Sequence, residues 1–143
     1  MKLKQKLIVI LMSHGKKKTG EKIVKKSLKS LQKATDKRHV DIIQQAILNS
    51  TPTFKVNKQL LKKGKRKSTR EIPTFLTNNL FRTTLSLKLI SRSLETLSSV
   101  KSFKVLVQEI LFASARQGKS VEQKIIFQKQ TLANRRHLSK FRW

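Results

Sequence analysis

The residues with the clearest potential for chemistry are two glycines surrounded by lysines. Gly15 and Gly20 stand five apart in the stretch SHGKKKTGEKIVKKS, which runs from Ser13 to Ser27. This is the glycine spacing of a phosphate-binding loop, in which backbone N–H groups hold a nucleotide. That motif continues with Lys and then Ser or Thr, whereas Gly20 is followed by Glu21 and no strand precedes the loop. We therefore interpret both glycines as turn residues between two helices.

The carboxylates and histidines do not form the patterns of a catalytic or metal-binding site. No two acidic residues share a spacing that would place them on one helical face, and we expect all seven to be solvated: Glu21, Asp36, Asp41, Glu71, Glu95, Glu109 and Glu122. The three histidines lie in separate segments, at His14, His39 and His137. The absence of cysteine excludes disulfides, thiol nucleophiles and zinc knuckles. We expect no enzymatic activity and no cofactor.

Positive charge is the dominant feature of the composition. The chain has 34 Lys and Arg against 7 Asp and Glu, a formal net charge of +27 that repels itself in a compact fold and favours a polyanionic partner. One basic cluster is typical of a solvated surface, but four together favour phosphate contacts: Lys16, Lys17 and Lys18; Lys62, Lys63, Lys65, Arg66, Lys67 and Arg70; Arg82, Lys88 and Arg92; and Arg135, Arg136 and Arg142.

The scarcity of aromatic residues narrows the kind of nucleic acid. The chain has no Tyr, one Trp and seven Phe, and most of the Phe residues fall at core positions of the predicted elements. Base stacking on aromatic side chains is the usual way to hold single strands. The composition therefore favours folded RNA, recognised by its shape and backbone. An architectural helical DNA-binding protein is the alternative.

Apolar residues at helical spacing predict three helices before Pro52. In the first, Leu3, Leu7, Ile8 and Leu11 fall at helical spacing, and the pattern stops before His14-Gly15. The second is capped by Thr19 and carries apolar residues on one face and lysines on the other: Ile23, Val24, Ser27, Leu28 and Leu31 against Lys25, Lys26, Lys29 and Lys33. The third ends at Thr51-Pro52 because a proline disfavours helical angles in the residue before it; its apolar residues are Val40, Ile43, Ala46 and Ile47.

Three further helices are predicted after Pro73. The fourth has apolar residues on two sides, so we expect it to be contacted on both: Leu80, Leu87, Ile90, Leu94 and Leu97 on one, and Phe81, Leu85 and Leu89 beside Arg82, Lys88 and Arg92 on the other. The fifth ends near Gly118 and contains Val100, Phe103, Leu106, Val107, Ile110 and Leu111. The sixth is capped by Ser120, with Val121, Ile125 and Leu132 facing the core.

Between the two prolines the pattern changes to alternation. Phe54 and Val56 alternate with Lys55 and Asn57, which predicts a two-stranded β-ribbon over about residues 53–76 with a basic loop around Gly64. A disordered loop is the alternative. The predicted fold class is mainly α, a single domain over residues 1–143 with about six helices, a protruding ribbon between the third and fourth, and a basic tail over about 135–143. No uncharged stretch reaches the ~18 residues of a membrane span, so we expect no membrane partner.

Motifs spread along the chain resemble the universal small-subunit ribosomal protein seven family. The opening stretch is similar to the family signature, with Leu7-Ile8, then Gly15-Lys16-Lys17, Ile23-Val24 and Ser27 in order. Further similarities are RTTLSLKLI at Arg82 to Ile90, EIL at Glu109 to Leu111, and the terminal Arg142-Trp143. These motifs run in family order over nearly the whole chain.

The resemblance implies a structural constituent of the small ribosomal subunit. It implies a helical body on a multihelix junction of the small-subunit rRNA in the head, contacted by Lys16 to Lys18, Arg82, Lys88 and Arg92, and a ribbon near the exit-site tRNA and the mRNA channel. It also implies the small-subunit proteins nine and eleven as neighbours, with no homo-oligomer. The excess of Lys over Arg and the scarcity of Gly, Ala and Pro indicate an AT-rich genome, which favours a mitochondrial matrix ribosome over a plastid or a bacterial cytoplasm.

Overall fold

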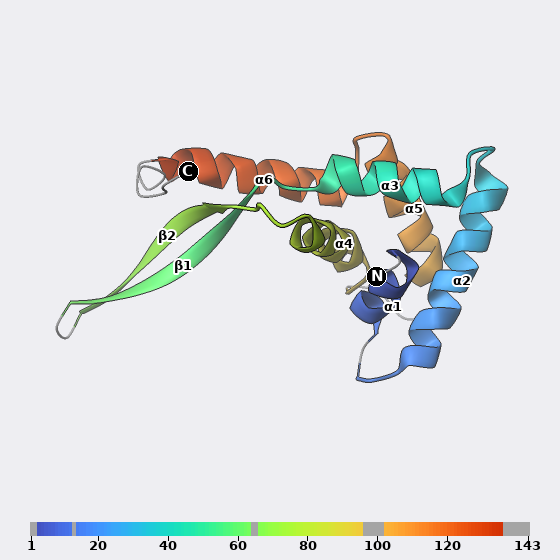
Figure 1. The fold of residues 1–143 in the computed structure, drawn as a ribbon, viewed down its shortest axis with the longest axis horizontal. Helices are drawn as coiled ribbons and strands as arrows, with labels where there is room; N and C mark the ends of the chain where they lie inside the picture. The colour runs from blue at the N-terminus through green and yellow to red at the C-terminus, as the bar shows by residue number, and fades with distance from the viewer. Residues whose placement is uncertain (1–2, 13, 64–65, 96–101, 136–143) are drawn as a thin grey trace.

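A computed structural model of the chain describes residues 3–12, 14–63, 66–95 and 102–135. Within these ranges it contains six helices and one two-stranded ribbon (Figure 1). In chain order the elements are α1 (Leu3–Leu11), α2 (Lys17–Ala34), α3 (His39–Ser50), β1 (Phe54–Lys63), β2 (Arg66–Phe75), α4 (Asn79–Glu95), α5 (Ser102–Ser114) and α6 (Lys119–Ala133). The ribbon lies between the third and fourth helices, which confirms the predicted mainly α fold with a protruding ribbon.

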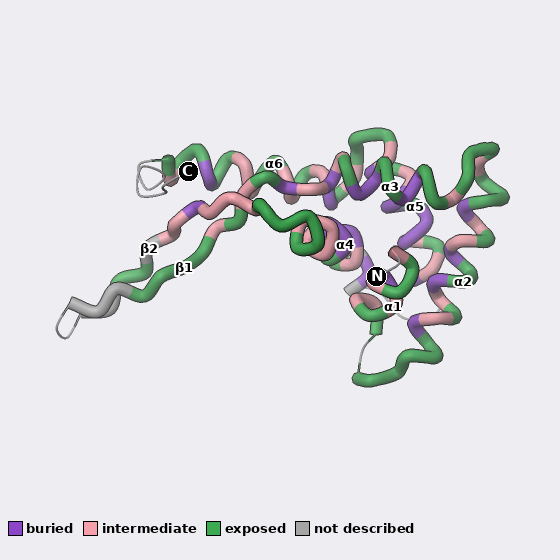
Figure 2. Tube along the Cα trace, viewed as in Figure 1, coloured by how far each residue is buried: buried purple, intermediate pink, exposed green. Residues whose placement is uncertain are grey.

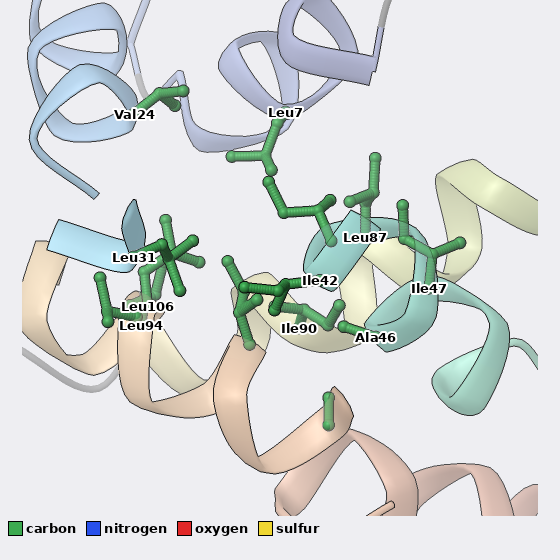
Figure 3. Close-up of a cluster of buried hydrophobic side chains, with 14 residues drawn as sticks. Leu7, Val24, Leu31, Ile42, Ala46, Ile47, Leu87, Ile90, Leu94 and Leu106 are labelled. Carbon is green, nitrogen blue, oxygen red and sulfur yellow. The ribbon is translucent and has the colours of Figure 1, made fainter. Parts of the chain in front are cut away.

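The core forms where five helices direct their apolar faces toward one another. Figure 3 shows side chains from α1 to α5 converging, among them Leu7, Val24, Ile42, Leu87 and Leu106. Leu31 and Ala46 have no solvent exposure at all, and Val24 and Leu106 have 1%. Full burial of one such aliphatic side chain contributes about 1.5–3 kcal/mol, so this cluster is the main source of stability for the helical body.

The start of α2 differs from the prediction in two respects. The helix begins at Lys17, so Thr19 lies inside the first turn and no side chain caps the helix. Gly20 is not a turn residue: it is helical and buried, and a Cβ added there would lie 3.4 Å from the carbonyl oxygen of Ile8 in α1. Gly15 alone acts as the predicted turn, with a φ of +74° that L-residues rarely adopt. Gly20 instead allows α1 and α2 to approach closely.

The start of α6 is capped by a residue from another helix. Ser120, the predicted cap, is the second residue of α6, and its backbone N–H donates a hydrogen bond to Glu109 Oε1 of α5 at 2.8 Å. Glu109 is 6% exposed, so the prediction of seven solvated carboxylates is wrong at this position. A carboxylate placed there satisfies an N–H that the helix leaves unpaired and interacts favourably with the positive end of the helix dipole.

Several apolar residues predicted for the core are exposed. On α6, Ile125 is 44% and Leu132 is 67% exposed, because this helix packs through the face that carries Ser120 and Thr131. Leu80 at the start of α4 is 63% exposed and Val40 on α3 is 44% exposed. The two-sided burial predicted for α4 is confirmed further along, since both its faces hold buried leucine or isoleucine residues: Leu87, Leu89, Ile90 and Leu94. Leu97 and Val100 fall outside the described residues.

The ribbon leaves the helical body at a packed base. Its strands pair in antiparallel register over ten pairs, from Phe54↔Phe75 to Lys63↔Arg66, which confirms the predicted two-stranded ribbon. At the base, the Phe54 and Phe75 rings lie with centroids 4.3 Å apart. Asn134, just after α6, donates a side-chain hydrogen bond to Glu71 Oε2 at 3.3 Å. Strands of this length extend about 33 Å, and Figure 1 shows the ribbon projecting away from α1, α2 and α5.

Candidate RNA-binding surfaces

The first candidate surface is the basic turn between α1 and α2. His14 and Gly15 both have positive φ, and the backbone N–H of Lys17 donates to the Gly15 carbonyl at 2.8 Å, so the chain reverses within a few residues. Lys16, Lys17 and Lys18 are all exposed at this reversal. The first turn of α2 has neither a capping side chain nor an acidic residue, and such a helix start favours an anion such as phosphate.

The second candidate surface is the far half of the ribbon. The register pairs Lys62 with Lys67, Lys63 with Arg66, and Gln59 with Arg70. Five of the six predicted basic residues therefore belong to the strands at the end remote from the helices, while Lys65 lies outside the described residues. The ribbon thus has two parts. Its packed base sets the position of the ribbon, and its far end carries the basic residues.

The third candidate surface is on α4, where the structure divides the predicted group. Lys88 and Arg92 are exposed and one helical turn apart, and Arg92 Nη1 donates to Gln123 Oε1 of α6 at 3.4 Å. Arg82 is half-buried, and its Nε is buried without a hydrogen-bond partner among the described residues. The six-residue step from Arg82 to Lys88 is also about 120° around a helix. Arg82 therefore does not share the face of Lys88 and Arg92.

Of the predicted carboxy-terminal arginines, the structure describes Arg135 alone. It is exposed just beyond the end of α6. Arg136 and Arg142, with the rest of the predicted tail, lie outside the described residues. The preceding residue, Asn134, is hydrogen-bonded through its side chain to Glu71 of β2, so Arg135 lies beside the ribbon.

The structure also reveals a surface that we did not predict. Lys18, Lys22, Lys25, Lys29 and Lys33 are all exposed on α2, and at 100° per residue they fall within an arc of about 80°. We call these five residues the lysine ridge. The amphipathic pattern of α2 predicts a solvated face for its later lysines, and Lys18 is the only one of the five predicted to bind RNA. The signal for the ridge is the recurrence of lysine after four, three, four and four residues.

One lysine is held by internal contacts and is not part of these surfaces. Lys124 Nζ donates to the Asn49 carbonyl at 2.8 Å, and Asn49 Nδ2 donates to the carbonyls of Ala113 and Ser114 at 3.0 and 2.9 Å. These bonds join α6 to the ends of α3 and α5. Burial, and secondarily the nearby charge of Arg116, lower the pKa of Lys124. Lys124 therefore has a structural role between three helices.

The part of the chain that the structure describes has no cluster of three His, Asp or Glu residues arranged to hold a metal ion. Its helices also lack the combination of length and apolar character that crossing a bilayer requires. What these residues do present to an external partner is a set of exposed lysines and arginines on several helices. Figure 2 shows how the exposed positions are distributed along the chain.

Six helices, a projecting antiparallel ribbon and a strongly basic surface define a small basic helical protein of the kind that works in a ribonucleoprotein. The sequence matches the family described as ribosomal protein S7p/S5e over residues 1–135, and the chain belongs to this family. It is thus a ribosomal protein of the small subunit, as the sequence motifs indicated.

Relatives of this chain include organellar members of the family. It is 28% identical over 138 residues to small ribosomal subunit protein uS7m of Reclinomonas americana, covering 96% of this chain and 83% of that protein. It is 32% identical over 114 residues to small ribosomal subunit protein uS7c of Euglena longa, covering 80% of this chain and 62% of that protein. A similar match to uS7c of Bigelowiella natans is 28% identical over 133 residues, 92% of this chain and 80% of that protein. The predicted likeness to organellar members is confirmed.

Proposed function

We propose that this protein binds small-subunit rRNA as a structural component and catalyses no reaction of its own. One observation carries the proposal: the positive charge has almost no internal compensation. Among the described residues the ion pairs are Arg38–Asp41 at 3.0 Å and Lys58–Glu71 at 3.6 Å, whereas the chain carries a net charge of +27. Such a charge destabilises the free protein by self-repulsion until a polyanion neutralises it. The phosphate backbone of rRNA is the polyanion available to a ribosomal protein.

The contacts of this proposal come from the predicted basic residues. Lys16 to Lys18 would bind phosphates at the uncapped start of α2, where backbone N–H groups add to the lysine charges. Lys88 and Arg92 would contact the backbone from α4, and Arg92 is the residue suited to bidentate phosphate contacts. The basic end of the ribbon and the carboxy-terminal arginines would add further contacts. Contacts of this kind hold folded RNA by its backbone and contribute little sequence information.

The finer placement of the protein is also part of the proposal. The helical body would bind a multihelix junction in the head, with the small-subunit proteins nine and eleven as neighbours. As the family resemblance implies, the ribbon would lie near the exit-site tRNA and the mRNA channel, and strands of its length would reach about 33 Å from the packed base. The likeness to uS7m, which covers 96% of this chain, supports a mitochondrial matrix ribosome.

A binding competition tests the function. The full chain is titrated with a labelled transcript of the lower-head rRNA junction, and unlabelled junction RNA or duplex DNA of equal length is added as competitor. We expect junction RNA to compete at much lower concentration than DNA, because the proposal requires recognition of RNA shape. Equal competition by duplex DNA would instead support an architectural DNA-binding protein and overturn the proposal.

Salt dependence tests the α4 contacts within the same assay. Removing one phosphate-bound residue lowers the slope of log affinity against log salt by roughly one unit, so Lys88→Gln with Arg92→Gln should lower it by about two. The matched control is Lys104→Gln with Lys129→Gln, which removes the same charge from exposed positions on α5 and α6. Equal changes in the two double variants would show that α4 makes no specific contact.

A further inference from the structure

The lysine ridge lies on a side of the molecule remote from the ribbon. In Figure 1, α2 forms one edge of the helical body and the ribbon projects from the opposite edge. The helix packs against α1, α5 and α3 through the face that carries Val24 and Leu31, and Figure 2 shows exposed residues recurring along its length. An RNA segment bound by the ribbon would therefore leave the ridge open to another segment.

The ridge consists of like charges at short helical spacing. Lys18 and Lys22, Lys25 and Lys29, and Lys29 and Lys33 are each four residues apart, and pairs at this spacing repel one another on a helix surface. No carboxylate of the described residues lies within 4 Å of their ammonium groups. Glu21, three residues after Lys18 and four before Lys25, offsets only part of this repulsion, and an external anion would remove the rest.

The geometry of the ridge fits the backbone of a nucleic-acid duplex. Lys33 is fifteen residues after Lys18, a distance of about 22 Å along the helix, with charges repeating every ~4.5–6 Å. A straight row of point charges matches a rigid row of phosphates. The ridge arc contains no apolar residue, whereas the centre of a protein–protein interface is usually rich in aromatic and apolar side chains. It contains no aromatic residue for base stacking either, which disfavours a single strand.

From these observations we propose that the lysine ridge is a further RNA-binding surface, which begins at Lys18 of the basic turn and contacts the phosphate backbone of an RNA duplex separate from the RNA at the ribbon. The proposal rests on the proposed rRNA-binding function and extends it: the protein joins two RNA segments from opposite sides. The partner is identified by its chemistry, a duplex backbone bound with little dependence on sequence.

The test compares two triple variants of the full chain. The ridge variant carries Lys22→Gln, Lys25→Gln and Lys29→Gln; the control carries Lys104→Gln, Lys119→Gln and Lys129→Gln, which removes equal charge from exposed positions outside α2. Affinity for a short blunt-ended RNA duplex is measured by fluorescence anisotropy across a salt series. The slope should fall by about two to three units in the ridge variant and by less than one in the control. Thermal unfolding without RNA should show the ridge variant at least as stable as the wild type.

Three results would overturn the proposal. Equal reductions of the slope of log affinity against log salt in the two variants would mean that the ridge adds only to net charge. No reduction in either variant would mean that the ridge makes no contact with the RNA duplex. If the ridge variant lost affinity for polyglutamate but kept its affinity for RNA, the surface would serve an acidic protein segment. These outcomes differ from failure of the proposed function, which would appear as a wild-type protein that does not prefer junction RNA to duplex DNA, whatever the ridge variant does.

Discussion

Removal of the Glu109 carboxylate should destabilise the junction between α5 and α6. Glu109 Oε1 accepts a hydrogen bond from the backbone N–H of Ser120 at 2.8 Å, and both residues are buried. In Glu109→Ala this N–H is left without its partner in a position that water reaches poorly. The start of α6 is also deprived of a negative charge beside its positive dipole end.

The magnitude follows from these two effects. A hydrogen bond to a charged group contributes about 1.5–3 kcal/mol, and this range already includes much of the dipole effect. The variant also removes the cost of burying a carboxylate, which offsets part of the destabilisation. We therefore expect Glu109→Ala to lower the free energy of unfolding by about 2 kcal/mol. Glu109→Gln keeps an acceptor oxygen but not the charge, so about 1 kcal/mol is expected for it.

Urea unfolding followed by circular dichroism, at moderate salt to limit self-repulsion, measures these differences. Ser120→Ala is the matched control, because the Ser120 hydroxyl is buried without a hydrogen-bond partner in the described structure while its backbone N–H is unaffected by the substitution. Its stability should equal or exceed that of the wild type. If Glu109→Ala were as stable as Ser120→Ala, the cap would contribute nothing and the reasoning would be refuted.

Three further predictions concern stability. Gly118→Ala should cost more than Gly15→Ala, about 2 kcal/mol or more against about 1, because both glycines have positive φ but an added Cβ at Gly118 would contact Glu109 Oε1 at 3.1 Å; equal destabilisation in urea unfolding would contradict this. Gly20→Leu should force α1 away from α2 and lower the melting temperature by several degrees, as calorimetry would show. Burial lowers the pKa of Lys124 below 10.5, so the folded state binds this proton more weakly than the unfolded chain. The stability of the wild type relative to Lys124→Met should therefore rise as pH approaches 10.5, and a difference that stays constant from pH 7 through 10.5 would refute the assignment.

The elements that could be predicted from sequence are those with local signals. The apolar face of α2 repeats at helical spacing, and Val24, Ser27 and Leu31 are buried as expected. The predictions are wrong where a segment distant in the sequence determines the structural role of a residue. Glu109 caps α6 from eleven residues away, which a search for a nearby Ser or Thr does not find. Gly20 resembles a turn residue in sequence, yet its role is set by Ile8 on another helix.

The candidate surfaces also divide into features that local sequence signals predict and features that only the folded structure reveals. Runs of lysine such as Lys16 to Lys18 are visible in the sequence, and the structure leaves them exposed. Arg82 and Lys88 lie about 120° apart around α4, so the helical repeat already separates two residues that a basic cluster in the sequence groups together. The sequence pattern identifies the lysines of the ridge only as residues on the side of α2 opposite the core. Such a side is ordinarily a solvated face. The five lysines align into one row because α2 is a continuous helix, and no carboxylate of the described residues forms an ion pair with them.

A cryo-EM map of the small ribosomal subunit that contains this chain tests the central claim most directly. We predict that the helical body lies against an rRNA junction in the head, with phosphates at salt-bridge distance from Lys16 to Lys18, Lys88 and Arg92. A second RNA helix should lie along the lysine ridge. A map in which the chain occupies the subunit but Lys88, Arg92 and the basic turn face solvent or protein would contradict the account.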